Sequence, residues 1–219
     1  MIEHVYRRAA ATSGVDAVVV ATDDRRIAAA VEAFGGTARM TDAGHQTGSD
    51  RIAEVARALP CEILVNVQGD LPLIEPEMIA EVIAPLAADH SITMSTLRQR
   101  ITVAAEYASP HVVKVVVDAQ GDALYFSRSP IPHRPAHAAG GPGEAFKHIG
   151  LYAYRREFLL TFAALPRTPL EQAESLEQLR ALEHGYRIRT VLTTRSSIEV
   201  DTPDDLERVR RTLAVEART

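Results

Sequence analysis

An aspartate directly after a buried strand is the first residue of this sequence that could do chemistry. The apolar run at residues 63–67 ends at Gly69-Asp70, and Pro72 prevents the strand from continuing. Ligands of open α/β sheets bind beyond the carboxyl ends of the strands. Asp70 is therefore expected where a metal ion or a substrate would lie. The alternative is that Gly69-Asp70 only forms a turn, because both residue types favour turns for backbone reasons.

The elements that must position Asp70 alternate between strands and helices. This alternation predicts an α/β fold with a mainly parallel sheet. A turn at residues 118–121 predicts a hairpin, and the Pro- and Gly-rich residues 130–143 predict a mobile surface loop. Strands are expected at residues 17–21, 38–40, 63–67, 92–97, 112–118, 123–127, 148–154 and 188–192. Helices are expected at residues 2–9, 25–34, 49–59, 76–87, 157–164 and 171–184, and from Pro203 onward.

Composition and charge limit the classes of function. The chain has 219 residues, of which 46% are hydrophobic and 24% charged, as is ordinary for a soluble globular protein. The net charge of −5 argues against a nucleic-acid-binding protein, but it allows an anionic substrate held by a local basic cluster or a divalent metal. No apolar run approaches the roughly 20 residues that span a bilayer, and no signal peptide is expected. Cys61 is the single cysteine, which favours the reducing cytoplasm.

The sequence begins inside the helix predicted at residues 2–9. Parallel α/β domains normally open with a strand and a loop that often binds phosphate. The sequence contains neither Gly-x-Gly-x-x-Gly nor Gly-x-x-x-x-Gly-Lys-Ser/Thr, so a dinucleotide-binding fold and a P-loop ATPase have no support. A phosphate-binding loop is expected to be absent or to lie upstream of Met1.

Seven ordered motifs, spread over nearly the whole chain, carry a resemblance to a known family. They are VATD at residues 20–23, HQTGSDR at 45–51, VNVQGDLP at 65–72, ALYFSR at 123–128, HIGLY at 148–152, LEQLR at 176–180 and VDTPDDLE at 200–207. In these motifs the sequence resembles the 3-deoxy-manno-octulosonate (Kdo) cytidylyltransferases, or CMP-Kdo synthetases.

The resemblance implies a fold, a reaction and an assembly. The fold is a Rossmann-like nucleotidyltransferase of the nucleotide-diphospho-sugar transferase type, with residues 1–219 in one domain and a hairpin-containing dimerisation lobe at about 98–160. The reaction is CTP + Kdo → CMP-Kdo + diphosphate, for lipopolysaccharide biosynthesis, in a cytoplasmic homodimer. No nucleic acid or membrane partner is implied.

Two departures from the family pattern are visible. Members of the family open with a strand and a basic, glycine-containing loop, and Met1-Ile2 aligns just after that loop. The groups expected to hold the CTP triphosphate are therefore not in this sequence. Leu71 stands where many members carry Glu, and we expect this change to tune the site.

The resemblance implies that Asp70 and Asp201 are catalytic residues and ligands of Mg²⁺. A divalent metal neutralises phosphate charge and lowers the pKa of the attacking hydroxyl, and Mg²⁺ prefers carboxylate oxygens. The alternative for Asp201 is that it caps the last helix. Thr202 and Asp205 already complete a capping box there, which leaves Asp201 for other work.

The resemblance implies that six polar or charged residues bind the sugar. They are Gln68, Arg128, His148, Tyr152, Glu177 and Gln178. Arg128 suits a carboxylate because its planar guanidinium donates two parallel hydrogen bonds; a surface salt bridge is the alternative. His148 is alternatively a core or edge histidine. Glu177 and Gln178 alternatively belong to a solvated helix face.

For the nucleotide, the resemblance points to the loop at residues 45–51, with Gln46, Thr47, Ser49 and Arg51 as binding residues. The loop offers hydroxyls, an amide and the backbone N–H groups of a helix N-terminus, which can read a cytosine edge. The alternative is that Ser49 and Asp50 are plain helix caps.

Two other functions remain open from the sequence. One is a cytidylyltransferase for a related acidic sugar, such as an amino-Kdo or a sialic-acid-like sugar. The other is an inactive truncated remnant that only binds a nucleotide or a partner.

Overall fold

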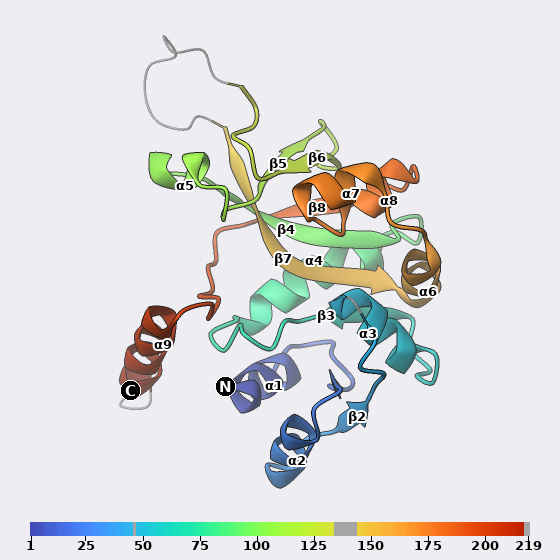
Figure 1. Cartoon of the computed structure of the whole chain (residues 1–219), viewed down its shortest axis with the longest axis vertical. Coiled ribbons are helices and arrows are strands. Elements are labelled where there is room, and N and C mark those ends of the chain that lie inside the picture. Colours follow the sequence, from blue (N-terminus) through green and yellow to red (C-terminus); the bar gives the residue numbers. More distant parts are fainter. Residues whose placement is uncertain (46, 134–143, 217–219) are drawn as a thin grey trace. The chain divides into compact units, whose positions relative to one another are not determined.

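The computed structural model describes residues 1–45, 47–133 and 144–216 (Figure 1). The chain divides into two compact units. The first unit comprises Met1–Leu59, Asn66–Ala80 and Arg195–Thr219, and the second comprises Pro60–Val65 and Glu81–Thr194. The single domain expected for residues 1–219, with its lobe at about 98–160, stays a prediction. Most of the surface loop expected at 130–143 lies outside the described residues.

The first unit contains a short parallel sheet covered by helices. β1 and β2 pair in parallel, with Val20 opposite Ala38, and α2 and α3 both pack against β1. The Asp24 carboxylate accepts the Arg26 N–H at 2.7 Å and so begins α2. The strand predicted at residues 17–21 begins later, at Val20, and has only three residues. The elements are α1 (Ile2–Ala10), β1 (Val20–Thr22), α2 (Arg25–Ala33), β2 (Ala38–Met40), α3 (Gly48–Ala56) and α9 (Pro203–Glu216).

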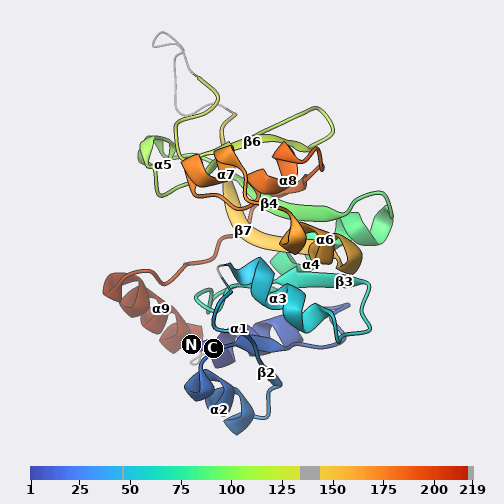
Figure 2. The ribbon, with the colours of Figure 1, turned by 45° about the vertical axis from the view of Figure 1, so that its right-hand side comes forward.

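The second unit is built on a mixed sheet with the strand order β6-β5-β7-β4-β8, and β3 also pairs with β7. Figure 2 shows the paired strands β4 and β7 side by side. β4 and β8 are parallel, but the β4–β7, β5–β6 and β5–β7 pairs are antiparallel. The α/β class is confirmed, and the sheet is mixed where the sequence suggested a mainly parallel one. The strands are β3 (Ile63–Asn66), β4 (Met94–Arg100), β5 (Lys114–Val117), β6 (Ala123–Ser127), β7 (Phe146–Arg155) and β8 (Arg189–Thr193).

The predicted hairpin between β5 and β6 is confirmed, and it brings the two ends of the sheet together. Asp118 Oδ1 accepts the N–H groups of Gln120 and Asp122, both at 2.8 Å, and Gly121 takes a φ of 85° in this turn. The Thr190 N–H then donates to the Gly121 carbonyl at 2.9 Å. The start of β6 therefore contacts β8, at the opposite end of the strand order.

The helix predicted at residues 171–184 is wrong, because the chain forms two short helices there. Ser175 adopts φ 54° and ψ 48°, the left-handed conformation, which ends the first helix. A buried ion pair between Glu171 and Arg180, at 2.6 Å, joins the two helices. The short helix α5 was not predicted. The helices, with α4 beginning in the first unit, are α4 (Pro76–Ala88), α5 (Ala104–Ala108), α6 (Arg156–Ala164), α7 (Pro169–Glu174) and α8 (Leu179–Glu183).

Aliphatic and aromatic side chains fill the core of the second unit. Tyr154 stacks on Phe162 with ring centroids 6.2 Å apart, and both side chains are buried. This packing fixes β7, the strand that carries His148 and Tyr152, against α6. None of the described helices is both long and apolar enough to cross a membrane.

Candidate functional site

Three carboxylates meet in the first unit. Asp70, Glu199 and Asp201 each offer one oxygen atom, and these atoms lie within 4.8 Å of one another. The Val200 N–H donates to the Asp70 carbonyl at 3.0 Å, and Arg195 forms an ion pair with Glu75. These two contacts join the loop after β3 to the segment before α9. The structure therefore brings the predicted pair of aspartates together and adds Glu199.

The cluster concentrates negative charge around the half-buried Asp70, while Glu199 and Asp201 keep exposed surface. Burial and the Asp201 carboxylate raise the pKa of Asp70, and burial together with both aspartates raises the pKa of Glu199. Asp70 Oδ1 is buried without a hydrogen-bond partner among the described residues. A divalent cation would compensate these charges. The donor set, oxygen only, fits Mg²⁺.

The alternative for Asp70, a turn, is found, whereas the cap that was the alternative for Asp201 is made by Thr202 instead. The Leu71 N–H donates to the Gln68 carbonyl at 3.4 Å, so Asp70 does lie in a turn. The capping box of α9 is confirmed, since Thr202 Oγ1 accepts the Asp205 N–H at 3.2 Å. Asp201 precedes this cap and is left exposed.

The predicted nucleotide loop is held firmly in the first unit. Thr47 Oγ1 accepts the Asp50 N–H at 3.1 Å and caps α3, where the sequence offered Ser49 or Asp50. Arg51 donates to Asp23 Oδ2 at 3.0 Å and to Thr41 Oγ1 at 2.6 Å. Ser49 is buried, and Gln46 lies outside the described residues. The nucleotide-binding role of this loop stays a prediction.

Gln68 lies beside this loop, in the first unit. Its Nε2 donates to Asn66 Oδ1 at 3.2 Å. A Cβ atom at Gly48 would lie 3.5 Å from Gln68 Nε2 and 3.6 Å from Asn66 Nδ2, so these amides contact the start of α3. The other five predicted sugar residues belong to the second unit.

His148 and Tyr152 sit in an aromatic cluster on β7. The His148 ring lies 5.0 Å from Phe126 and 5.3 Å from Tyr152, and its Nε2 lies 2.9 Å from Thr96 Oγ1. Burial lowers the pKa of His148 to about 3, so the ring is neutral near pH 7. His148 is therefore packed and hydrogen-bonded, as its alternative interpretation as a core or edge histidine predicted. A sugar hydroxyl could use this ring as a neutral hydrogen-bond partner, not as a cation.

Arg128 makes no ion pair with a carboxylate through its guanidinium in the described part of the chain. Its Nε donates to the Glu174 carbonyl at 2.9 Å and its Nη1 to the Pro110 carbonyl at 3.1 Å. The surface salt bridge, which was the alternative for this residue, is not found among the described residues. The guanidinium keeps donors for an added carboxylate.

Glu177 and Gln178 lie in the turn between α7 and α8, where the sequence placed them on one helix. Gln178 is only 3% exposed, and its Nε2 has no partner among the described residues. A buried amide donor without a partner is costly. Gln178 Nε2 is therefore suited to donate a hydrogen bond to a ligand oxygen.

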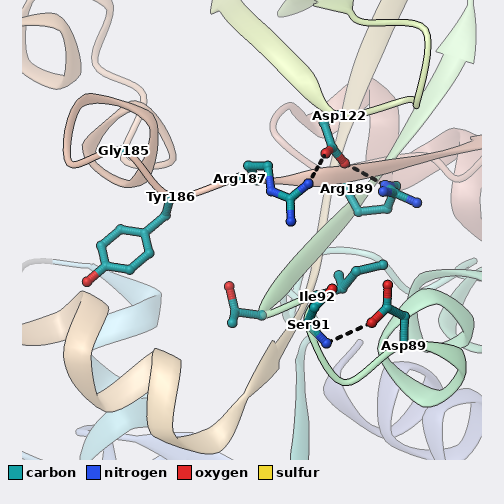
Figure 3. A pocket seen from close by; sticks show the side chains of 9 residues that line it. Asp89, Ser91, Ile92, Asp122, Gly185, Tyr186, Arg187 and Arg189 are labelled. Carbon is teal, nitrogen blue, oxygen red and sulfur yellow. Dashed lines mark hydrogen bonds and ion pairs between the residues drawn. The ribbon is translucent and has the colours of Figure 1, made fainter.

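A separate hollow of about 240 Å³ lies in the second unit (Figure 3). Asp122 accepts from Arg189 at 2.5 Å and from Arg187 at 3.5 Å on its wall. The charges of its lining residues compensate one another, and none of the predicted site residues lines it. The lining residues are Asp89, Ser91, Ile92, Thr93, Asp122, Gly185, Tyr186, Arg187 and Arg189.

Sequence reasoning missed Glu199, although a signal was present. Glu199 and Asp201 are two residues apart, and side chains with this spacing share one side of an extended segment. Glu174 and Lys114, which contact Arg128, were also missed, because their contacts join segments far apart in the sequence.

Known cytidylyltransferases are similar to nearly the whole chain. A cytidylyltransferase family model matches residues 1–188. The 3-deoxy-manno-octulosonate cytidylyltransferase of Geobacter metallireducens is 57% identical over 217 residues, covering 95% of this chain and 85% of the relative. The enzyme of the same name from Geotalea uraniireducens is 58% identical over 217 residues, covering 95% of this chain and 86% of the relative.

Solved structures agree with these relatives. A CMP:2-keto-3-deoxy-manno-octonic acid synthetase complexed with CTP superposes with a TM-score of 0.91 and 46% identity, covering 98% of this chain and 88% of that one. A 4-diphosphocytidyl-2C-methyl-D-erythritol synthase from Anaerococcus prevotii gives a TM-score of 0.62 at 14% identity, covering 97% of this chain and 85% of that one. The second likeness shows a shared fold alone.

Proposed function

This chain belongs to the 3-deoxy-manno-octulosonate cytidylyltransferase family, and we propose that it catalyses CTP + Kdo → CMP-Kdo + diphosphate. The high identity over nearly the whole chain and the match to a synthetase complexed with CTP support this function. The observation that carries it is the carboxylate cluster of Asp70, Glu199 and Asp201, with oxygens within 4.8 Å. A reaction between two anions needs such a place for a divalent cation.

In this proposal Asp70 and Asp201 hold Mg²⁺. When bound, the ion neutralises the phosphates and favours the ionised form of the attacking sugar hydroxyl. Asp70 contributes an oxygen that is buried and has no partner among the described residues. The chain's own part is to keep the two aspartates together, which the hydrogen bond from Val200 to Asp70 supports.

The second unit is proposed to bind the sugar. Arg128 donates to the Kdo carboxylate, since its guanidinium contacts only carbonyl oxygens in the described part of the chain. Neutral His148 and the Gln178 amide bind hydroxyl groups, and Glu177 accepts from them. Tyr152 keeps the His148 ring in place, with ring centroids 5.3 Å apart.

We also propose that the protein is a cytoplasmic homodimer. Within the lobe at about 98–160, Val103 is 53% exposed and Leu124 is 62% exposed. Apolar side chains in such positions suit a surface that a second copy covers.

The metal ligands are tested by replacing Asp70 with Asn. Product formation from CTP, Kdo and Mg²⁺ is expected to fall at least about 100-fold, because metal stabilisation of transition-state charge is worth several kcal/mol. The exposed Asp16→Asn, in the same unit, is the matched control and is expected to keep its activity. Unchanged activity of Asp70→Asn would refute the ligand role.

A further inference from the structure

Arg128 is fixed by the chain around it before any ligand binds. Its backbone N–H donates to Glu174 Oε2 at 2.9 Å, and its Nε donates to the Glu174 carbonyl at 2.9 Å. Its Nη1 donates to the Pro110 carbonyl at 3.1 Å, and its own carbonyl accepts from Lys114 Nζ. Both the backbone and the guanidinium of Arg128 are therefore held, and Glu174 makes two of these contacts.

The Glu174 carboxylate is built into the end of β6. Besides the Arg128 N–H it accepts Ser127 Oγ at 2.6 Å and the Tyr125 hydroxyl at 3.4 Å. Burial opposes the charge, but these donors and the Arg128 guanidinium still lower the pKa of Glu174. Near pH 7 it is thus an acceptor only. Glu174 ends α7, and the left-handed Ser175 follows it and turns the chain toward Glu177.

Lys114 supports the same arrangement from β5. Its side chain has no exposed surface, and its Nζ donates to the carbonyls of Ser109 at 2.8 Å, Val112 at 2.6 Å and Arg128. An ammonium group has three donors, and all of them are used on backbone carbonyls. The peptide after Arg128 is therefore anchored to the interior of the second unit.

This arrangement leaves one part of Arg128 available. Among the described residues, its Nη2 has no hydrogen-bond partner, while Nε and Nη1 are held by carbonyls. A guanidinium whose rotamer is already fixed loses less freedom when it binds a carboxylate. Pre-orientation of this kind raises affinity without any new contact to the ligand.

We propose that Glu174 is a positioning residue, which aims the Arg128 guanidinium at the carboxylate of the acidic sugar. The inference rests on the proposed function, because it takes Arg128 as the group that binds that carboxylate. Glu174 itself touches no substrate in this proposal. It acts through Arg128, and Lys114 fixes the backbone behind it.

The test uses Glu174→Gln, which keeps the shape of the side chain but replaces one acceptor oxygen by an NH₂ group. The KM for Kdo is expected to rise about tenfold, the lower end of the loss seen when residues that orient metal ligands are changed, while the KM for CTP and the thermal midpoint stay close to those of the unaltered chain. The matched control is Glu183→Gln. Glu183 also accepts backbone N–H groups of α7, from Leu170 at 3.0 Å and Glu171 at 3.3 Å, but the carboxylate contact to Arg128 belongs to Glu174.

A double-mutant cycle separates positioning from general stability. If Glu174 acts through Arg128, Glu174→Gln adds nothing to the rise in KM for Kdo that Arg128→Ala produces. A further rise in the double variant, or equal rises in the KM for Kdo and CTP, would overturn the inference. So would an unchanged KM for Kdo in Glu174→Gln while Arg128→Ala raises it.

Failure of the proposed function gives a different result. In that case the unaltered chain neither forms CMP-Kdo nor binds Kdo in titration calorimetry, whatever residue stands at position 174. An active chain in which Arg128→Ala leaves the KM for Kdo unchanged would overturn the inference alone, because the activity would survive without the proposed carboxylate contact.

Discussion

At the scale of single residues, the candidate site is defined by two places where charges are left without a balancing partner in the described residues. Asp70, Glu199 and Asp201 hold like charges within 4.8 Å, whereas Arg128 has a guanidinium that contacts carbonyls in the described residues. Like charges at close range disfavour ionisation of the group. The three carboxylates therefore suit a metal ion. The Arg128 guanidinium, which forms no ion pair in the described residues, suits an acidic substrate.

The carboxylate cluster predicts the behaviour of Glu199→Gln. Without metal this variant is expected to melt about 2 °C higher than the unaltered chain, because one like charge is removed. With Mg²⁺ its melting temperature is expected to rise less, since one anionic oxygen is lost. Differential scanning calorimetry in EDTA and in Mg²⁺ measures both shifts, with Asp16→Asn as control. A lower melting temperature of Glu199→Gln in EDTA would contradict the charge argument.

At the scale of elements, the backbone conformation of one residue decides where α7 ends. α7 stops at Ser175 in the left-handed conformation, with φ 54°. A left-handed residue other than glycine costs roughly 1–2 kcal/mol. This turn places Glu177 and Gln178 between two helices, close to the end of the helix that carries Glu174.

The Ser175 turn predicts that a β-branched residue is poorly tolerated there. Ser175→Val is expected to lower the free energy of unfolding by about 1–2 kcal/mol, because a branched Cβ clashes in this conformation. Ser175→Gly, which fits a positive φ, is the control and is expected to lie near the unaltered value. Urea unfolding followed by circular dichroism compares them. Equal stability of the Val and Gly variants would argue against strain at this turn.

The cap of α2 predicts a pH dependence. The Arg26 guanidinium and N–H hold the pKa of Asp24 at about 2, below its ordinary 3.8. The stabilisation by the charged cap is therefore complete above pH 3.8 and is lost as the pH falls toward 2. The difference in melting temperature between the unaltered chain and Asp24→Asn should therefore shrink as the pH falls from about 4 to about 2. A constant difference over this range would count against the ionised cap.

Elements could be predicted where their signal lies within a few neighbouring residues of the sequence. The capping box at Thr202 and the hairpin turn at residues 118–121 were visible in the sequence because each is made within a few residues. The break at Ser175 could not be predicted, because no Gly or Pro interrupts residues 171–184. The ion pair between Glu171 and Arg180, which joins the two short helices, forms across this break. Asp70 was found from the end of a strand. Glu174 was not, because it meets Ser127 only in the folded chain.

At the scale of the whole molecule, the chain consists of two compact units with different predicted tasks. The carboxylates and the nucleotide loop belong to the first unit, and most of the predicted sugar residues belong to the second. The family assignment covers both, since relatives more than half identical span 95% of the chain. The proposed reaction therefore needs the whole chain.

The proposed homodimer predicts a change of mass on mutation. The unaltered chain is expected to elute with twice the mass of one chain in size-exclusion chromatography with light scattering. Leu124, which is 62% exposed on β6, is proposed to lie in the contact. Leu124→Glu is expected to shift the population to monomers, because a buried unpaired charge is costly. Exposed Val215→Glu, on α9, is the control. A monomeric unaltered chain would contradict the proposal.

Phosphorus NMR of the unaltered chain with CTP, Kdo and Mg²⁺ measures the proposed reaction itself. We expect the α-phosphate of CTP to become the phosphodiester of CMP-Kdo while free diphosphate forms in equal amount. The same mixture without Kdo should leave CTP intact. Persistence of CTP in the complete mixture, or its conversion to CMP without a sugar ester, would contradict the proposed reaction.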